Sequence, residues 1–173
     1  MHALELSNTR DRHLGRILQL QATHNGATRF LITDDQAVTF AEAEELTNRL
    51  AAGLQSLGVN EGDRVAMLLS NRPEMVLLCL ALNKIGAIWV PVCTDYRGEW
   101  LLDTLQRSRP ALLVTDGEYV GRIAAIADQL GEVGFVTLDD CDGQLPGSHG
   151  YQALLENAPL EVDYDRLGYA DTC

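Results

Sequence analysis

The chain has one lysine, few aromatic residues and no long apolar run. The lysine, Lys84, stands in an apolar stretch just ahead of Gly86. A phosphate-binding loop of the GxxxxGK[ST] type places a lysine among closely spaced glycines, where its charge adds to that of the backbone N–H donors. Lys84 lacks that setting, so it cannot be such a lysine. The GxGxxG, GxSxG and HExxH patterns are absent too, which removes the usual signals of a dinucleotide site, a hydrolase nucleophile and a zinc protease.

Membrane and redox signals are equally scarce. No apolar run approaches the roughly 20 residues that cross a bilayer, and the first residues do not resemble a secretion signal. We therefore expect no membrane span and a cytoplasmic protein. The cysteines lie far apart with no CxxC pair, which indicates neither a zinc site nor a thioredoxin-like motif. Cys79 falls within an apolar helix and is predicted to pack as a small hydrophobic residue.

Acidic residues outnumber basic ones by 25 to 13 and give a net charge of −12. Such a surface repels phosphate backbones and anionic lipids, so we expect no nucleic-acid partner and no membrane-surface role. After residue 138 the acidity rises further, and Arg166 is the one basic residue there. We predict two parts: an α/β N-terminal subdomain over residues 1–138 and an acidic, weakly ordered segment over residues 139–173.

Short apolar runs alternate with helical patterns along most of the chain. Val65 to Leu69 is a continuous apolar run, typical of a strand buried on both faces of a parallel sheet. Thr39 and Glu42 form a capping-box pattern, and Pro73 opens a later helix. We expect strands over residues 29–33, 37–39, 65–69, 87–91, 111–115 and 133–138, and helices over 13–23, 40–57, 73–85, 99–107, 119–130 and 151–157. The fold class is therefore α/β, a largely parallel sheet flanked by helices.

Three finer expectations concern the packing of two helices and the position of one loop. The apolar stripe of the helix over residues 40–57 is predicted to lie against a sheet. Trp100 is predicted to pack beside Leu101 and Leu105. Residues 139–150, rich in Asp and Gly, are predicted to form a surface loop.

Three polar clusters are candidates for chemistry. Asn71-Arg72-Pro73-Glu74 follows a buried strand and opens a helix, where α/β proteins often bind ligands, although a capped helix start explains it more simply. Arg107 and Arg109 offer an anion site, but two arginines at a helix end also complement its dipole. The acidic group at Asp139, Asp140 and Asp142 lacks the further oxygen ligands that calcium requires.

The four histidines are dispersed, and each is predicted to be a surface residue rather than a ligand or base. They are His2, His13, His24 and His149. No residue is therefore assigned a catalytic, cofactor-binding or metal-binding role.

Several short segments of the sequence, in their order and spacing, nevertheless resemble the motifs of one family. They are Thr39-Phe40-Ala41-Glu42-Ala43 with Asn48-Arg49-Leu50-Ala51, Gly62-Asp63-Arg64-Val65, Asn71-Arg72-Pro73-Glu74, Leu82-Asn83-Lys84-Ile85-Gly86-Ala87-Ile88-Trp89-Val90-Pro91, and Tyr96-Arg97-Gly98-Glu99-Trp100-Leu101. Together they resemble the N-terminal subdomain of the adenylate-forming (AMP-binding) enzymes: acyl-CoA synthetases, peptide-synthetase adenylation domains and luciferases. Within this family, the segments most resemble those of the acid–CoA ligases, including the carnitine-type group.

The resemblance implies an activity for a full-length parent protein. Members of the family use ATP and magnesium to convert a carboxylic acid to an acyl-adenylate with release of pyrophosphate, then pass the acyl group to a thiol such as coenzyme A. Their phosphate loop, adenine-binding motifs, magnesium-binding glutamate and catalytic lysine all lie downstream of the matched region. We therefore expect this chain to be truncated before the phosphate loop, inactive alone, and to bind none of these cofactors by itself.

Other interpretations remain open at this stage. The chain could be a non-catalytic binding or scaffold module of the same fold, or part of an adenylation domain that loads a carrier protein instead of coenzyme A. The expected partner of the parent is its carboxylic-acid substrate, with fatty acid metabolism as the expected context. A second copy of the chain is kept as a candidate partner.

Overall fold

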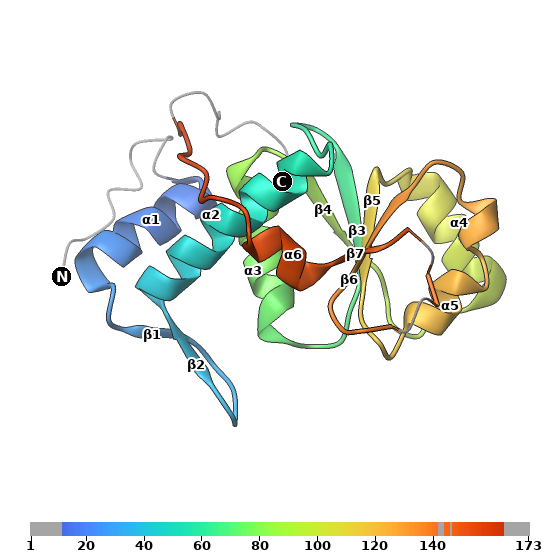
Figure 1. Cartoon of the computed structure of the whole chain (residues 1–173), viewed down its shortest axis with the longest axis horizontal. Helices are drawn as coiled ribbons and strands as arrows, with labels where there is room; N and C mark the ends of the chain where they lie inside the picture. Colours follow the sequence, from blue (N-terminus) through green and yellow to red (C-terminus); the bar gives the residue numbers. More distant parts are fainter. Residues whose placement is uncertain (1–11, 142–143, 146, 165–173) are drawn as a thin grey trace.

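The structure is a computed structural model that describes residues 12–141, 144–145 and 147–164. Strands and helices alternate along most of this length (Figure 1). In chain order the elements are α1 (Leu14–Asn25), β1 (Arg29–Ile32), β2 (Ala37–Thr39), α2 (Phe40–Ser56), β3 (Arg64–Leu68), α3 (Pro73–Lys84), β4 (Ile88–Pro91), α4 (Gly98–Ser108), β5 (Leu112–Thr115), α5 (Val120–Ala124), η2 (Ala127–Gln129), β6 (Gly134–Thr137), β7 (His149–Gly150) and α6 (Tyr151–Leu155).

Five of the strands form one parallel sheet in the order β4-β3-β5-β6-β7. β3 is an inner strand, in which Ala66 is paired with Val90 of β4 on one side and with Leu113 of β5 on the other. β1 and β2 form a separate antiparallel hairpin that projects from the body beside α1 and α2 (Figure 1). The predicted α/β fold with a largely parallel sheet is confirmed.

The sheet separates two hydrophobic cores. Side chains of a strand point alternately to opposite faces, and Val65 and Met67 of β3 accordingly join one core while Ala66 and Leu68 join the other. The first core also holds buried residues of α1, α2, α3 and α6, and the second those of α4 and α5 (Figure 1). The prediction that the Val65 run is buried on both faces is therefore confirmed.

Local sequence signals set the ends of α2. The Thr39 hydroxyl accepts a hydrogen bond from the Glu42 N–H at 3.3 Å, and the Glu42 carboxylate accepts one from the Thr39 N–H at 2.8 Å. This is the predicted capping box, and the backbone N–H of Thr39 lowers the pKa of Glu42. At the other end, Gly58 adopts φ +88°, a conformation that glycine tolerates better than other residues.

One packing prediction is only partly right, and two other predictions are wrong. α2 packs against α1, α3 and α6, while its buried residues also share the first core with Val65 and Met67 of β3, so helices as well as the sheet cover its apolar stripe. Trp100 is 75% exposed and lies near Tyr96, because the buried face of α4 is set by Leu101 and Leu105, four residues apart. The helix predicted over residues 119–130 is broken at Ile126, whose φ of −127° separates α5 from η2.

The chain beyond residue 138 adds a strand and a helix to the same body. His149 and Gly150 form β7, which pairs with β6, so the loop predicted over residues 139–150 is interrupted by a strand. The predicted short helix is confirmed as α6, where Tyr151 and Leu154 are buried. The division of the chain at residue 138 stays a prediction. No described helix is long and apolar enough to cross a membrane.

α6 approaches α2 so closely that only glycine fits at one position. A Cβ added at Gly53 would lie 2.7 Å from the backbone oxygen of Leu154 and 2.8 Å from its Cα. Backbone atoms cannot move aside as a flexible side chain can. Gly53 is therefore the residue that lets the segment after β7 pack on α2.

We expect Gly53→Ala to lower the free energy of unfolding by about 1–3 kcal/mol, because the added methyl group forces α6 away from α2. Thermal and urea unfolding measure the change. Gly121→Ala is the matched control: Gly121 also lies inside a helix, and the nearest atom to its added Cβ is the Gln144 side-chain oxygen at 3.8 Å, so this change should not lower the free energy of unfolding. Equal stability of the two variants would contradict the close approach.

Candidate functional site

The carboxyl ends of β3, β5 and β6 meet at one edge of the sheet, since these strands are parallel and in register. The residues that follow them are Ser70 to Arg72, Asp116 with Gly117, and Asp139. Ligands of open α/β sheets bind beyond the carboxyl ends of the strands. We therefore take this edge as the candidate functional site.

Asp116 joins the loop after β3 to the loop after β5. Its side chain is almost fully buried, with the residue 2% exposed. One carboxylate oxygen accepts hydrogen bonds from the Ser70 N–H at 2.8 Å and the Ser70 hydroxyl at 2.7 Å, and the other accepts one from the Glu118 N–H at 3.1 Å. A buried carboxylate needs such donors, because its desolvation is otherwise costly. Asp116 thus fixes where the chain leaves β3.

Arg72 makes a second connection across the same edge. Its Nε donates to Glu74 at 3.0 Å, and its Nη1 donates to Asp139 at 3.1 Å. Asp139 also accepts the Gly117 N–H at 2.9 Å. The Gly117 hydrogen bond, followed by the one from Arg72, lowers the pKa of Asp139, whereas the bond to Glu74 raises the pKa of Arg72. Three loops are held together by two carboxylates and one guanidinium.

A hollow of about 380 Å³ opens beside this connection, between the ends of β6 and β7. Its lining includes Asp139, Asp140, Cys141, Ser148 and Tyr151. Burial raises the pKa of the Tyr151 phenol, and the nearby Glu74 adds to that shift. The phenol therefore stays protonated at neutral pH and can act as a hydrogen-bond donor, not as a base.

Lys84 lies on α3, away from any phosphate-binding loop, and connects α3 to α2. Its side chain is 0% exposed, and its Nζ contacts the Glu44 carboxylate at 2.8 Å and the Asn48 side-chain oxygen at 2.6 Å. Burial lowers the pKa of Lys84, while the hydrogen bond and charge of Glu44 act in the opposite direction. The Lys84 amine therefore connects α3 to Glu44 and Asn48 of α2.

The structure brings together only some of the residues that the sequence singles out. Arg72 of the turn at residues 71–74 pairs with Asp139 in the loop after β6, and Ser70, just before the turn, donates two hydrogen bonds to Asp116 in the loop after β5. Neither Asp116 nor Asp139 was predicted as a partner, although each directly follows an apolar run that forms a strand. His13 and His24 lie at opposite ends of α1, and His149 lies in β7, so these three histidines form no cluster. His2 and Asp142 lie outside the described residues. Cys79 packs against the first core as predicted.

Among the described residues, no group of three metal-ligating side chains is present. In that part of the chain, Lys84 is buried and ion-paired, and Arg72 is already shared by two carboxylates. These residues do not form a site for a triphosphate and its magnesium ion. The carboxyl edge of the sheet instead holds the loops after β3, β5 and β6 in a fixed arrangement beside the hollow.

Comparisons with known proteins match this architecture to one family. Residues 18–162 match the family described as AMP-binding enzyme. Over 131 residues the chain is 33% identical to the medium/long-chain-fatty-acid–CoA ligase FadD6 of Mycobacterium tuberculosis, covering 75% of this chain and 22% of that protein. Over 81 residues it is 42% identical to the crotonobetaine/carnitine–CoA ligase of Salmonella paratyphi A, covering 47% of this chain and 16% of that one.

A solved structure from Rhodopseudomonas palustris CGA009, assigned as a long-chain-fatty-acid CoA ligase, superposes with a TM-score of 0.83. Its identity is 26%, over 92% of this chain and 39% of that one. The chain thus spans less than a quarter of the length of the two curated relatives and well under half of the solved structure.

The buried Lys84–Glu44 pair should matter for stability. We expect Lys84→Met to lower the free energy of unfolding by about 3 kcal/mol, because it leaves the largely buried Glu44 carboxylate without its cation. Arg107→Gln is the control, since Arg107 and Asp103 form an exposed pair whose loss should cost no more than about 0.5 kcal/mol. Urea unfolding at neutral pH measures both. Similar values for the two variants would show that Lys84 is not buried with Glu44.

The Asp139 contacts predict a pH dependence. Its pKa in the folded protein should lie below the usual value of about 3.9, so its contribution to stability is present above that value and is lost as the pH falls through the folded pKa. An NMR titration of the carboxyl carbon measures the pKa. Arg72→Gln should raise it only in part, because the Gly117 N–H remains. A pKa at or above the usual value would contradict these contacts.

Proposed function

The chain belongs to the AMP-binding enzyme family, and from that membership we propose that it is the N-terminal part of an ATP-dependent acid–CoA ligase. The reaction proposed for the whole protein is the condensation of a carboxylic acid with ATP to an acyl-adenylate and pyrophosphate. Transfer of the acyl group to the thiol of coenzyme A then releases AMP. The family predicted from the motifs between residues 39 and 101 is confirmed.

The observation that carries the proposal is the 33% identity to FadD6 over 75% of the chain. That relative is a fatty-acid–CoA ligase, and the Salmonella relative is also a CoA ligase. Both names support a carboxylic acid as the substrate and coenzyme A as the acceptor. A fatty acid is the proposed substrate class, and the cytoplasm is the proposed location.

The low coverage of the relatives supports an assignment of the chemistry to other parts of the parent. Lys84 and Arg72 give no support for ATP and magnesium binding at the carboxyl edge, because Lys84 is buried against Glu44 and Arg72 is shared between Glu74 and Asp139. We therefore propose that these residues supply a rigid sheet edge and that ATP, magnesium and coenzyme A are held elsewhere in the parent. No reaction step is assigned to a residue of this chain.

The 173-residue chain should release no pyrophosphate from ATP and magnesium with any of a panel of carboxylic acids. The parent chain, extended through its downstream reading frame, should release pyrophosphate with a fatty acid and then consume coenzyme A. An enzyme-coupled pyrophosphate assay measures both, with heat-treated protein as the blank. A circular dichroism spectrum of the 173-residue chain serves to check that it is folded.

Two outcomes would overturn parts of the proposal. Turnover by the 173 residues alone would place the chemistry within them. A reading frame that continues without a Ser/Thr/Gly-rich loop ending in lysine would exclude the ligase and favour the scaffold module. Acyl transfer to a carrier protein but not to coenzyme A would replace the proposed acceptor.

A further inference from the structure

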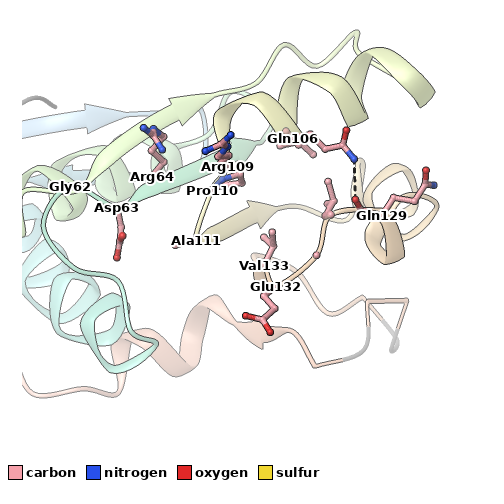
Figure 2. Close-up of a pocket in the computed structure, with 13 residues that line it drawn as sticks. Gly62, Asp63, Arg64, Gln106, Arg109, Pro110, Ala111, Gln129, Glu132 and Val133 are labelled. Atoms are coloured by element: carbon pink, nitrogen blue, oxygen red, sulfur yellow. Dashed lines mark hydrogen bonds between the residues drawn. The ribbon is translucent and has the colours of Figure 1, made fainter.

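A second and larger hollow lies at the opposite edge of the sheet. It has a volume of about 550 Å³ and opens where β3, β5 and β6 begin (Figure 2). Such a volume is typical of small-molecule sites. Arg64 at the start of β3 and Arg109 at the end of α4 both line it. Gln106 closes one side, since its side-chain amide donates to the Gln129 carbonyl oxygen at 3.1 Å.

We call this hollow, at the amino ends of β3, β5 and β6, the amino-edge groove. No described carboxylate neutralises its two guanidinium groups. Within the part of the chain that the structure describes, neither Arg64 nor Arg109 has an ion pair or a side-chain hydrogen bond. By contrast, Arg49, Arg72 and Arg107 each pair with a carboxylate. Arg64 and Arg109 are both exposed, so an anion from solvent can reach their guanidinium groups.

The two nearby carboxylates do not pair with Arg64 or Arg109. Asp63 and Glu132 also line the groove, but in Figure 2 their carboxylates point away from the two guanidinium groups. The Asp63 carboxylate accepts the Asn60 N–H at 2.8 Å, which keeps it in its own turn. The two guanidinium groups therefore lie on one side of the groove, apart from the two carboxylates.

The backbone at Arg109 adopts the left-handed conformation. Arg109 has φ +48° and ψ +59°, and it is the one described residue other than glycine with a positive φ. Helices commonly end in this conformation, but with glycine or asparagine, which adopt it at lower cost. Unfavourable backbone conformations are concentrated at functional sites. An arginine here costs stability and places a guanidinium in the groove.

We propose that the amino-edge groove binds a small molecule through a diphosphate group. Each guanidinium can donate two parallel hydrogen bonds, so two of them need about four acceptor oxygens. A single carboxylate has two oxygens and satisfies one guanidinium, whereas a diphosphate has enough for both. The net negative charge of the chain disfavours non-specific binding of anions, so binding requires this local pair. The proposal does not depend on the ligase reaction.

Isothermal titration calorimetry of the 173-residue chain with sodium pyrophosphate, without divalent metal and at low salt, tests the proposal. Saturable binding is expected with a Kd of about 1 mM or tighter. Arg64→Gln and Arg109→Gln should each weaken it by about tenfold or more. Arg107→Gln removes the same charge outside the groove and should change the affinity by less than about twofold. Succinate should bind more weakly than pyrophosphate.

Arg109→Gly separates a ligand role from a structural one. Glycine relieves the unfavourable φ, so this variant should unfold at a higher temperature than the wild type and yet lose pyrophosphate binding. Absence of saturable binding to the wild type would overturn the proposal. So would binding that Arg72→Gln abolishes and the Arg64 and Arg109 variants keep, because the anion would then lie at the carboxyl edge. The pyrophosphate-release assay on the extended parent tests the ligase separately.

Discussion

The parallel pairing of β3 with β4 on one side and β5 on the other determines where the polar groups of this chain can lie. Strands that run in one direction put all their carboxyl ends at one edge and all their amino ends at the other. The Ser70, Asp116 and Asp139 loops consequently meet at the first edge, and Arg64, Ala111 and Val133 line a hollow at the second. Both sites follow from one feature of the backbone.

That sheet is held between two unlike layers. On one side α1, α2, α3 and α6 form a helical layer, and the Lys84–Glu44 pair is buried within it. A charge pair in such a place adds little net stability but specifies how α3 lies on α2, since a shifted helix would leave both charges unpaired. On the other side α4 and α5 cover a smaller core, and the end of α4 brings Arg109 to the groove.

Local patterns were sufficient to predict most of the fold. The apolar runs predicted the strands, and the capping box at Thr39 predicted the start of α2 because both partners lie within one turn. The position of α2 could not be predicted that way, since an apolar stripe does not reveal whether a sheet or other helices cover it. The same holds for Trp100, whose exposure depends on which face of α4 the sheet receives.

The candidate site was less accessible to sequence reasoning. The turn at residues 71–74 could be recognised by its place after a strand, but Asp116 and Asp139 are 46 and 67 residues away from their partners Ser70 and Arg72. Only the register of β3, β5 and β6 reveals that they meet. Arg64 and Arg109 are likewise far apart in the sequence. Their shared hollow exists because β5 returns beside β3.

Carboxylates hold the loops in place at the carboxyl edge of the parallel sheet. Amide hydrogen exchange at Ser70 and Gly117 tests this most directly, because both N–H groups donate to side-chain carboxylates instead of to a strand. The account predicts that both amides are protected in the wild type, that Asp116→Ala exposes Ser70 while Gly117 stays protected, and that Asp139→Ala does the reverse. Exchange of both amides in the wild type at the rate of an unstructured loop would contradict it.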